Sequence, residues 1–196
     1  MGFHSSWIAV RGKPAEKVRS ELRLKETAER ESLPESDVTA LALPSGWYVV
    51  FFNDPSPSDL EEKSLARLSA GAELMMFVVE EASMVSLASG YAGGRRIWTV
   101  GHDSSKGPTH LDSEGALPEV VSKTRDRLLA QSRAGASGGD HVFDLPAELS
   151  KAITGFRHDE EIEGLDGNAF VVLERVEGPI TTWVRGMNAL LGVLRN

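Results

Sequence analysis

The strongest constraint in the sequence is the run from Glu73 to Glu80 (ELMMFVVE), which is apolar at every position between its two terminal glutamates. A strand with one face in water alternates apolar and polar residues, whereas a strand covered on both faces is apolar throughout. The run therefore predicts a central strand of a sheet that is covered on both faces. At 196 residues, the chain is long enough to bury such a sheet without a metal ion or a disulfide.

Other predicted strands share an enrichment in branched and aromatic residues and lie between glycine and proline turn signals. They are Ser6 to Val10, Val38 to Leu43, Trp47 to Phe52, Met84 to Tyr91, Arg95 to His102, His141 to Phe143 and Ala169 to Val176. Two pairs of these strands flank the short turns Pro44-Ser45-Gly46 and Ala92-Gly93-Gly94. Each of these two pairs predicts a β-hairpin.

Apolar residues at helical spacing predict helices between and after these strands. The first helices run from Pro14 to about Leu24, from a capping box of Ser58 and Glu61 to Gly71, and from Pro118 along Val121, Thr124 and Leu128. The later ones lie between Asp144 and Gly155 and along a C-terminal apolar stripe of Trp183, Met187, Leu190, Leu191 and Leu194. Residues 25–37 are polar and predict a surface loop, and residues 133–140 (RAGASGGD) predict a flexible linker.

The predicted order of elements up to residue 80 is β-α-β-β-α-β, which is the connectivity of a ferredoxin-like fold. We therefore expect an α+β protein with a mainly antiparallel sheet, with helices packed on it and an amphipathic C-terminal helix. The length suits one domain over residues 1–196. The alternative division is a ferredoxin-like half at 1–103 and an extension of helices and a strand at 104–196. A fold of this kind carries no function with it.

Composition excludes several classes of function. The chain has no cysteine, which excludes disulfides, thiolate nucleophiles and cysteine-ligated metal sites and fits a reducing, cytoplasmic location. Its net charge of -8 opposes nonspecific binding to nucleic acid or to anionic lipid and favours a basic partner. Its apolar runs are shorter than a membrane span. We therefore expect neither nucleic acid nor a membrane among its partners.

The stretch from Gly155 to Gly167 (GFRHDEEIEGLDG) concentrates acidic residues beside a histidine and is the most prominent candidate site. Read as a calcium-binding loop that begins at Asp159, it places Phe170 at the position of the bidentate glutamate. The ligand that closes the calcium cage is therefore missing. The competing interpretation is a hydrated acidic connector between two structured segments.

Three neighbouring His/Asp pairs lie at predicted element ends: His102-Asp103, Asp140-His141 and His158-Asp159. If the fold brings His102, His158 and Asp159 together, or Glu160 in place of Asp159, they form a two-histidine, one-carboxylate metal site. Spacing alone does not show that they converge. The competing interpretation is that each loop histidine is a solvated or capping side chain.

Other motifs fail on their structural context. The sequence GASGG around Ser137 fits G-x-S-x-G, but that nucleophile requires a turn from strand to helix, and the predicted order here is reversed. In GHDSSKG, Lys106 precedes Gly107, so the order needed for a phosphate-binding loop is absent. No G-x-G-x-x-G is present to bind a dinucleotide. The sequence therefore predicts no cofactor and no defined catalytic residue.

The sequence leaves several functions open, and whether the protein is an enzyme stays undecided. The first hypothesis is a non-enzymatic interaction module that presents acidic loops, Glu29 to Asp37 and Asp159 to Asp166, to a basic partner. Toxin-neutralising immunity proteins share these general properties, by analogy only. The alternatives are a metal-dependent hydrolase that uses His102, His158 and Asp159, and a small-molecule sensor with a pocket between the sheet and the C-terminal segment. The C-terminal helix also allows a homodimer.

Overall fold

The computed structural model describes residues 2–133, 141–162, 164–165 and 167–176. The strands are β1 (His4–Arg11), β2 (Leu24–Glu31), β3 (Val38–Ala42), β4 (Tyr48–Phe52), β5 (Glu73–Glu80), β6 (Val85–Ala92), β7 (Arg95–Asp103), β8 (Asp112–Gly115) and β9 (Phe170–Arg175). The helices are α1 (Ala15–Leu22), α2 (Glu62–Leu68), α3 (Glu119–Arg133) and α4 (Leu145–Thr154), with short 3-10 turns η1 (Ser58–Leu60) and η2 (Ser104–Lys106). Within this part of the chain, none of the helices has the length and apolar character needed to cross a membrane.

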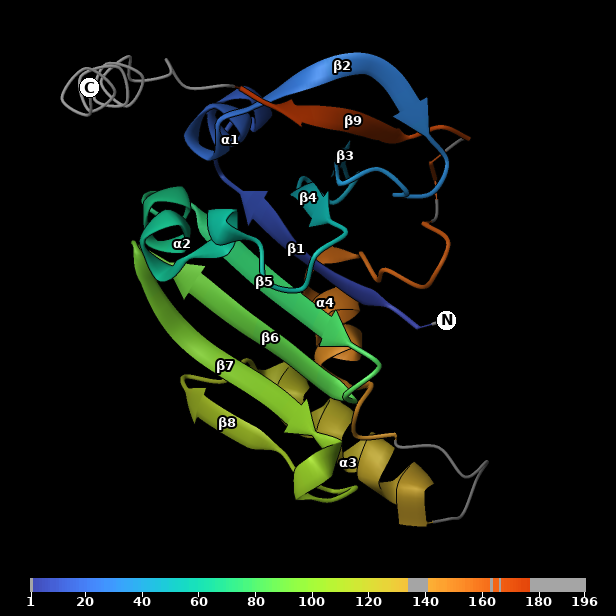
Figure 1. Cartoon of the computed structure of the whole chain (residues 1–196). Coiled ribbons are helices and arrows are strands. Elements are labelled where there is room, and N and C mark those ends of the chain that lie inside the picture. Colours follow the sequence, from blue (N-terminus) through green and yellow to red (C-terminus); the bar gives the residue numbers. More distant parts are fainter. Residues whose placement is uncertain (1, 134–140, 163, 166, 177–196) are drawn as a thin grey trace, which may run out of the picture.

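These strands form one twisted sheet in the order β2-β9-β3-β4-β1-β5-β6-β7-β8 (Figure 1). Every neighbouring pair in it is antiparallel. The predicted α+β class and mainly antiparallel sheet are therefore confirmed. Both predicted hairpins are present, as β3–β4 and as β6–β7. β9 comes from the end of the described chain and lies between β2 and β3, so the sheet joins distant parts of the sequence.

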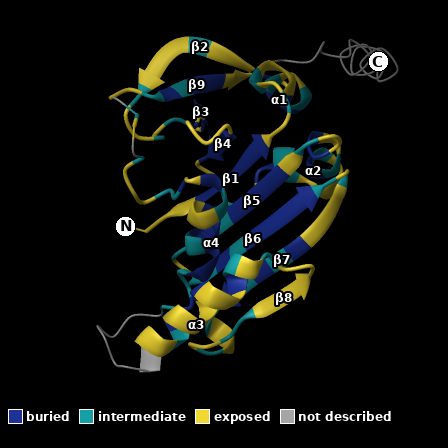
Figure 2. Ribbon diagram, turned by 180° about the vertical axis from the view of Figure 1, so that it is seen from behind, coloured by how far each residue is buried: buried dark blue, intermediate teal, exposed yellow. Residues whose placement is uncertain are grey.

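Helices cover both faces of the sheet. Trp7 and Ala9 of β1 belong to an apolar cluster that includes leucines and valines of α3 and α4. The residues between and after them, Ile8 and Val10, belong to a second cluster with apolar residues of α1 and α2. We call these the α3–α4 face and the α1–α2 face; the first faces the viewer in Figure 2. Because alternate residues of a strand point to opposite faces, β1 must be apolar throughout to serve both clusters.

β5 confirms the prediction made from its continuous apolar sequence. Met75, Phe77 and Val79 face the α3–α4 cluster, whereas Leu74 and Met76 face the α1–α2 cluster. The strand lies inside the sheet, between β1 and β6. The helix predicted from the spacing of Val121, Thr124 and Leu128 is also confirmed as α3. All three side chains are buried.

The ferredoxin-like order is not confirmed. The polar segment at residues 25–37, predicted to be a loop, begins with the strand β2, so the chain runs β-α-β-β-β-α-β up to residue 80 and its sheet order differs. β2 is the edge strand beside β9, and only Leu24 in it is buried. A strand exposed on both faces carries no apolar alternation, and its pairing partner lies far away in sequence. Local pattern therefore gave no signal for it.

The structure adds one strand and contradicts two further local predictions. Between the predicted strand Arg95 to His102 and the predicted helix at Pro118 lies the short edge strand β8, which is exposed throughout (Figure 2). The segment His141 to Phe143 is a turn into α4 rather than a strand. The predicted capping box does not start α2, because Ser58 begins the turn η1 and the helix begins at Glu62. At α4, by contrast, Gly155 ends the helix as predicted, with a φ of 86° that favours glycine.

Several predictions lie outside the described residues. They concern the linker at 134–140 with Ser137 and Asp140, and the amphipathic helix with Trp183, Met187, Leu190, Leu191 and Leu194. Those predictions therefore stand as made.

The pairing of β6 and β7 places Gly90 opposite Trp98, and a Cβ atom on Gly90 would overlap the indole ring. We expect Gly90→Ala to lower the free energy of unfolding by about 1–3 kcal/mol, because the buried indole must move in a packed core. Urea denaturation measures the change. Gly101→Ala is the matched control, since the nearest atom there is the flexible end of Leu87, and its expected cost is below about 1 kcal/mol. Equal losses in both variants would show that Trp98 does not require a glycine opposite it.

Candidate functional site

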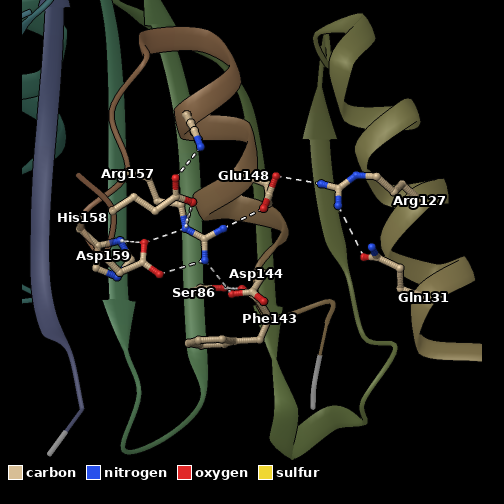
Figure 3. A network of polar contacts seen from close by, with 11 residues as sticks. Ser86, Arg127, Gln131, Phe143, Asp144, Glu148, Arg157, His158 and Asp159 are labelled. Carbon is tan, nitrogen blue, oxygen red and sulfur yellow. Dashed lines mark hydrogen bonds and ion pairs between the residues drawn. The ribbon is translucent and has the colours of Figure 1, made fainter. Parts of the chain in front are cut away.

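In the acidic stretch that follows α4, the cation Arg157 has a side chain that is 11% exposed and is surrounded by carboxylates. Its Nε and Nη2 atoms donate to the two carboxylate oxygens of Asp159 at 2.7 and 3.0 Å. Its Nη1 donates to Glu148 at 2.8 Å, and Nη2 also donates to Asp144 at 3.2 Å (Figure 3). A guanidinium presents five N–H donors in a rigid fork, so one arginine can serve three carboxylates.

Two further ion pairs extend this arrangement. Lys151 of α4 donates to Glu160, and Arg127 of α3 donates to Glu148 at 2.8 Å (Figure 3). We call the whole set the Arg157 cluster; its members are Arg127, Asp144, Glu148, Lys151, Arg157, Asp159 and Glu160. The cluster ties both helices of the α3–α4 face to the loop that follows α4.

The charges in the cluster respond to both burial and pairing. Burial raises the pKa of Asp159, but hydrogen bonds from Arg157 outweigh it and hold that pKa below its usual value. At Asp144, burial dominates over the attraction of Arg157 and raises the pKa. Asp144 stands at the N-cap of α4, but its carboxylate makes no capping hydrogen bond and accepts from Arg157 instead. Arg157, an arginine within the acidic stretch, was the signal in the sequence for this ion pairing.

His158 points from the same loop into an aromatic pocket. Its ring lies 4.6 Å from that of Phe3 and 5.1 Å from that of Phe77, measured between centroids. The side chain is 5% exposed, and Nδ1 lies 3.8 Å from Asp159, too far for a hydrogen bond. Within the described residues this buried nitrogen has no hydrogen-bond partner. Burial lowers the pKa of His158 below its ordinary 6.5, so the ring is neutral at pH 7.

His102 is fully buried on β7, on the same face of the sheet. Its Nδ1 lies 2.7 Å from the carbonyl oxygen of His110, which can only accept, so Nδ1 carries the hydrogen. Nε2 therefore accepts a hydrogen bond from the Ser104 hydroxyl at 2.9 Å. In addition, the amide of Asp103 donates to Nδ1 of His110. These bonds hold the segment between η2 and β8 against the end of β7, and we call them the His102 latch.

The structure does not bring the three predicted metal ligands together. His158 and Asp159 are neighbours, whereas His102 is engaged with Ser104 and His110. Across the described ranges, no group of three or more His, Asp or Glu side chains is placed to hold a metal ion. Metal binding by His102, His158 and Asp159 stays a prediction to which this geometry adds no support.

The Ser104 hydroxyl and His102 have the spacing of a nucleophile and its base. Acyl transfer also needs N–H donors that stabilise the oxyanion. The amide of Ser104 donates to Met84, that of Ser105 to Asp103, and that of Gly107 to the Ser104 carbonyl. These three amides are therefore already used, and the pair is better explained as part of the latch.

The first acidic loop, at residues 29–37, has a different character from the Arg157 cluster. Glu29, Glu35 and Asp37 are exposed, and Leu33 is 64% exposed, a large value for an aliphatic residue. The loop is nevertheless ordered by side chains. Glu31 accepts hydrogen bonds from the backbone of Glu35 and from Ser36. We call residues 29–37, which comprise the end of β2 and the segment that leads to β3, the Leu33 loop. The polar pattern of its sequence did not predict that Leu33 would be exposed.

Comparisons with protein-family models, with curated proteins and with solved structures find no significant match to this chain. Its function must therefore be argued from its own geometry.

Replacing Arg157 with methionine tests the Arg157 cluster. We expect the free energy of unfolding at pH 7 to fall by about 2–4 kcal/mol, because three partly buried carboxylates lose their shared donor. Chemical denaturation at 25 °C measures the loss. The matched control is Arg127→Met, where the side chain is 48% exposed and, among the described residues, is ion-paired with Glu148; we expect a loss below about 1 kcal/mol. Similar losses for both arginines would contradict the central position of Arg157.

His158 should make the stability of the protein depend on pH. The unfolded chain takes up a proton near pH 6.5, whereas burial lowers the pKa in the folded state. The stabilisation is therefore complete above pH 6.5 and is lost as pH falls from there toward the folded-state pKa, at up to about 1.4 kcal/mol per pH unit. Unfolding free energies measured from pH 7.5 to pH 5 should fall less steeply in His158→Phe. A slope in His158→Phe equal to that of the wild type would refute this prediction.

Proposed function

We propose that the protein is a non-enzymatic interaction module that binds a basic protein through the Leu33 loop. The observation that carries this proposal is the exposure of Leu33, at 64%, on a loop whose shape is held by internal hydrogen bonds. Single exposed apolar residues are common on protein surfaces. Leu33, however, lies on a loop that hydrogen bonds hold in one shape, and ordered loops often position the residues that bind.

The hydrogen bonds of the Leu33 loop favour binding because they reduce its entropic cost. The amide of Asn53 donates to the carbonyls of Pro34 and Ser36, at 2.9 and 2.7 Å. The backbone of Asn53 also donates to Asp37. Burial would raise the pKa of Glu31, but its bonds from Ser36 and Glu35 hold that pKa below the ordinary value, so the carboxylate stays charged and able to accept. A loop already held in one shape loses little freedom on binding.

The charge around Leu33 selects the kind of partner. Glu35 and Asp37 in the same loop and Glu29 near the end of β2 are exposed, and the whole chain carries a net charge of -8. Such a field accelerates encounter with a basic surface and disfavours an acidic one. The complementary partner has an apolar pocket for Leu33 and a rim of lysine or arginine. The Arg157 cluster is less suited to this role, because its carboxylates already bind cations of the same chain.

Affinity capture with the full-length protein tests this proposal. At about 50 mM salt, we expect the immobilised protein to retain a basic protein from its own cells, and Leu33→Ser and Glu35→Lys each to reduce the retained amount at least about fivefold. At about 500 mM salt, capture should weaken because the charges are screened. Leu117→Ser is the matched control, since Leu117 is also exposed but lies before α3. Retention that survives both Leu33 loop variants, or that salt does not change, would overturn the proposal.

A further inference from the structure

A hollow of about 210 Å3 opens on the α3–α4 face, between α3, the segment that includes β8 and the turn before α4. Buried aliphatic side chains form its floor: Leu128, Val142 and Leu145. Its exposed rim is polar and consists of Thr109, Ser113 and Arg125. An apolar hollow with a few converging polar groups is the usual form of a small-ligand site.

The walls of the hollow are held in place by buried hydrogen bonds. On one side, the His102 latch holds the carbonyl of His110, between the lining residues Thr109 and Leu111. On the other side, the hydroxyl of Ser86 on β6 donates to the carbonyl of Phe143 at 2.7 Å, next to the lining residue Val142. The hollow is thus preformed, and a ligand need not order it on binding.

The charge on the rim indicates the chemistry of the ligand. Arg125 is the cation among the lining residues, and its guanidinium makes an exposed ion pair with its chain neighbour Asp126, at 3.0 Å. A pair of this kind contributes little stability, so an incoming carboxylate can take the place of Asp126 at small cost. Arginine binds a carboxylate through two parallel N–H bonds, and the apolar floor would accept an aliphatic chain.

The volume limits the size of that ligand. Sites for drug-sized molecules measure roughly 300–1,000 Å3, so a hollow of about 210 Å3 suits a shorter molecule. We propose that this hollow binds a short aliphatic carboxylate, with the carboxylate on Arg125 and the chain on Leu128, Val142 and Leu145. The site lies away from the Leu33 loop and does not depend on the function proposed for that loop.

Titration of the full-length protein with hexanoate, followed by NMR chemical shifts, tests this site. We expect saturable binding with a dissociation constant of about 0.1–1 mM, in line with the small number of ligand atoms. Arg125→Met keeps the aliphatic stem and should weaken hexanoate at least about fivefold while leaving hexanol unchanged. Lys123→Met is the matched control, an exposed cation on the same helix that is paired with Glu119 and does not line the hollow.

A second pair of variants fills the hollow instead of removing its charge. Ser113 lines the hollow, whereas the next residue of β8, Glu114, points to the opposite face of the sheet. Ser113→Phe should therefore abolish hexanoate binding, and Glu114→Phe should leave it intact, with both proteins folded by circular dichroism. The site is disproved if hexanoate shows no saturable binding up to about 10 mM, if hexanol binds as tightly, or if neither Arg125→Met nor Ser113→Phe weakens binding.

Discussion

The two-sided burial of the central strands is the constraint on which the rest of this structure depends. On β1, successive residues Trp7 and Ile8 enter two different apolar clusters, and both are fully buried. β5 divides its residues between the same two clusters. Each cluster therefore needs its own helical cover, and the chain supplies α1 and α2 on one face and α3 and α4 on the other. Polar and charged side chains therefore lie mainly at the ends of strands, in loops and at the two edges of the sheet.

The Arg157 cluster shows how the cover on one face is held in place. α4 packs leucines on the sheet, and Arg157, in the loop beyond the helix, binds Asp144 and Glu148 and so ties that loop to α4. The same loop places His158 against Phe77 of β5. Two acids of this loop, Asp159 and Glu160, are thus ion-paired in a connection between α4 and the loop that follows it. Its single arginine decides this outcome, because it supplies donors to three carboxylates at once.

The two proposed binding surfaces lie toward opposite edges of the sheet. The Leu33 loop begins in the last residues of β2, which forms one edge, and the hollow lies beside β8, which forms the other. In both places internal hydrogen bonds shape a surface that is exposed, at Leu33 by Asn53 and at the hollow by His102 and Ser86. In many proteins, rigid central strands support functional groups that lie on ordered segments at the periphery. The distance along the sheet lets the two surfaces act independently.

Local sequence determined the elements whose residues carry a buried, periodic pattern. The apolar run of β5, the hairpins around their turns, and the stripe of Val121, Thr124 and Leu128 on α3 all follow from burial on one or two faces. Burial imposes a period on neighbouring residues, so a local pattern can reveal it. Only the tertiary structure decided the edge strands β2 and β8, the pairing of β2 with β9, and the partners of His102, His158 and Asp159. Exposed strands carry no such period. The partner of a side chain depends on segments that only the fold brings together. The sequence therefore identified the histidines and acids, but not the guanidinium of Arg157 that binds Asp159 or the carbonyl of His110 that binds His102.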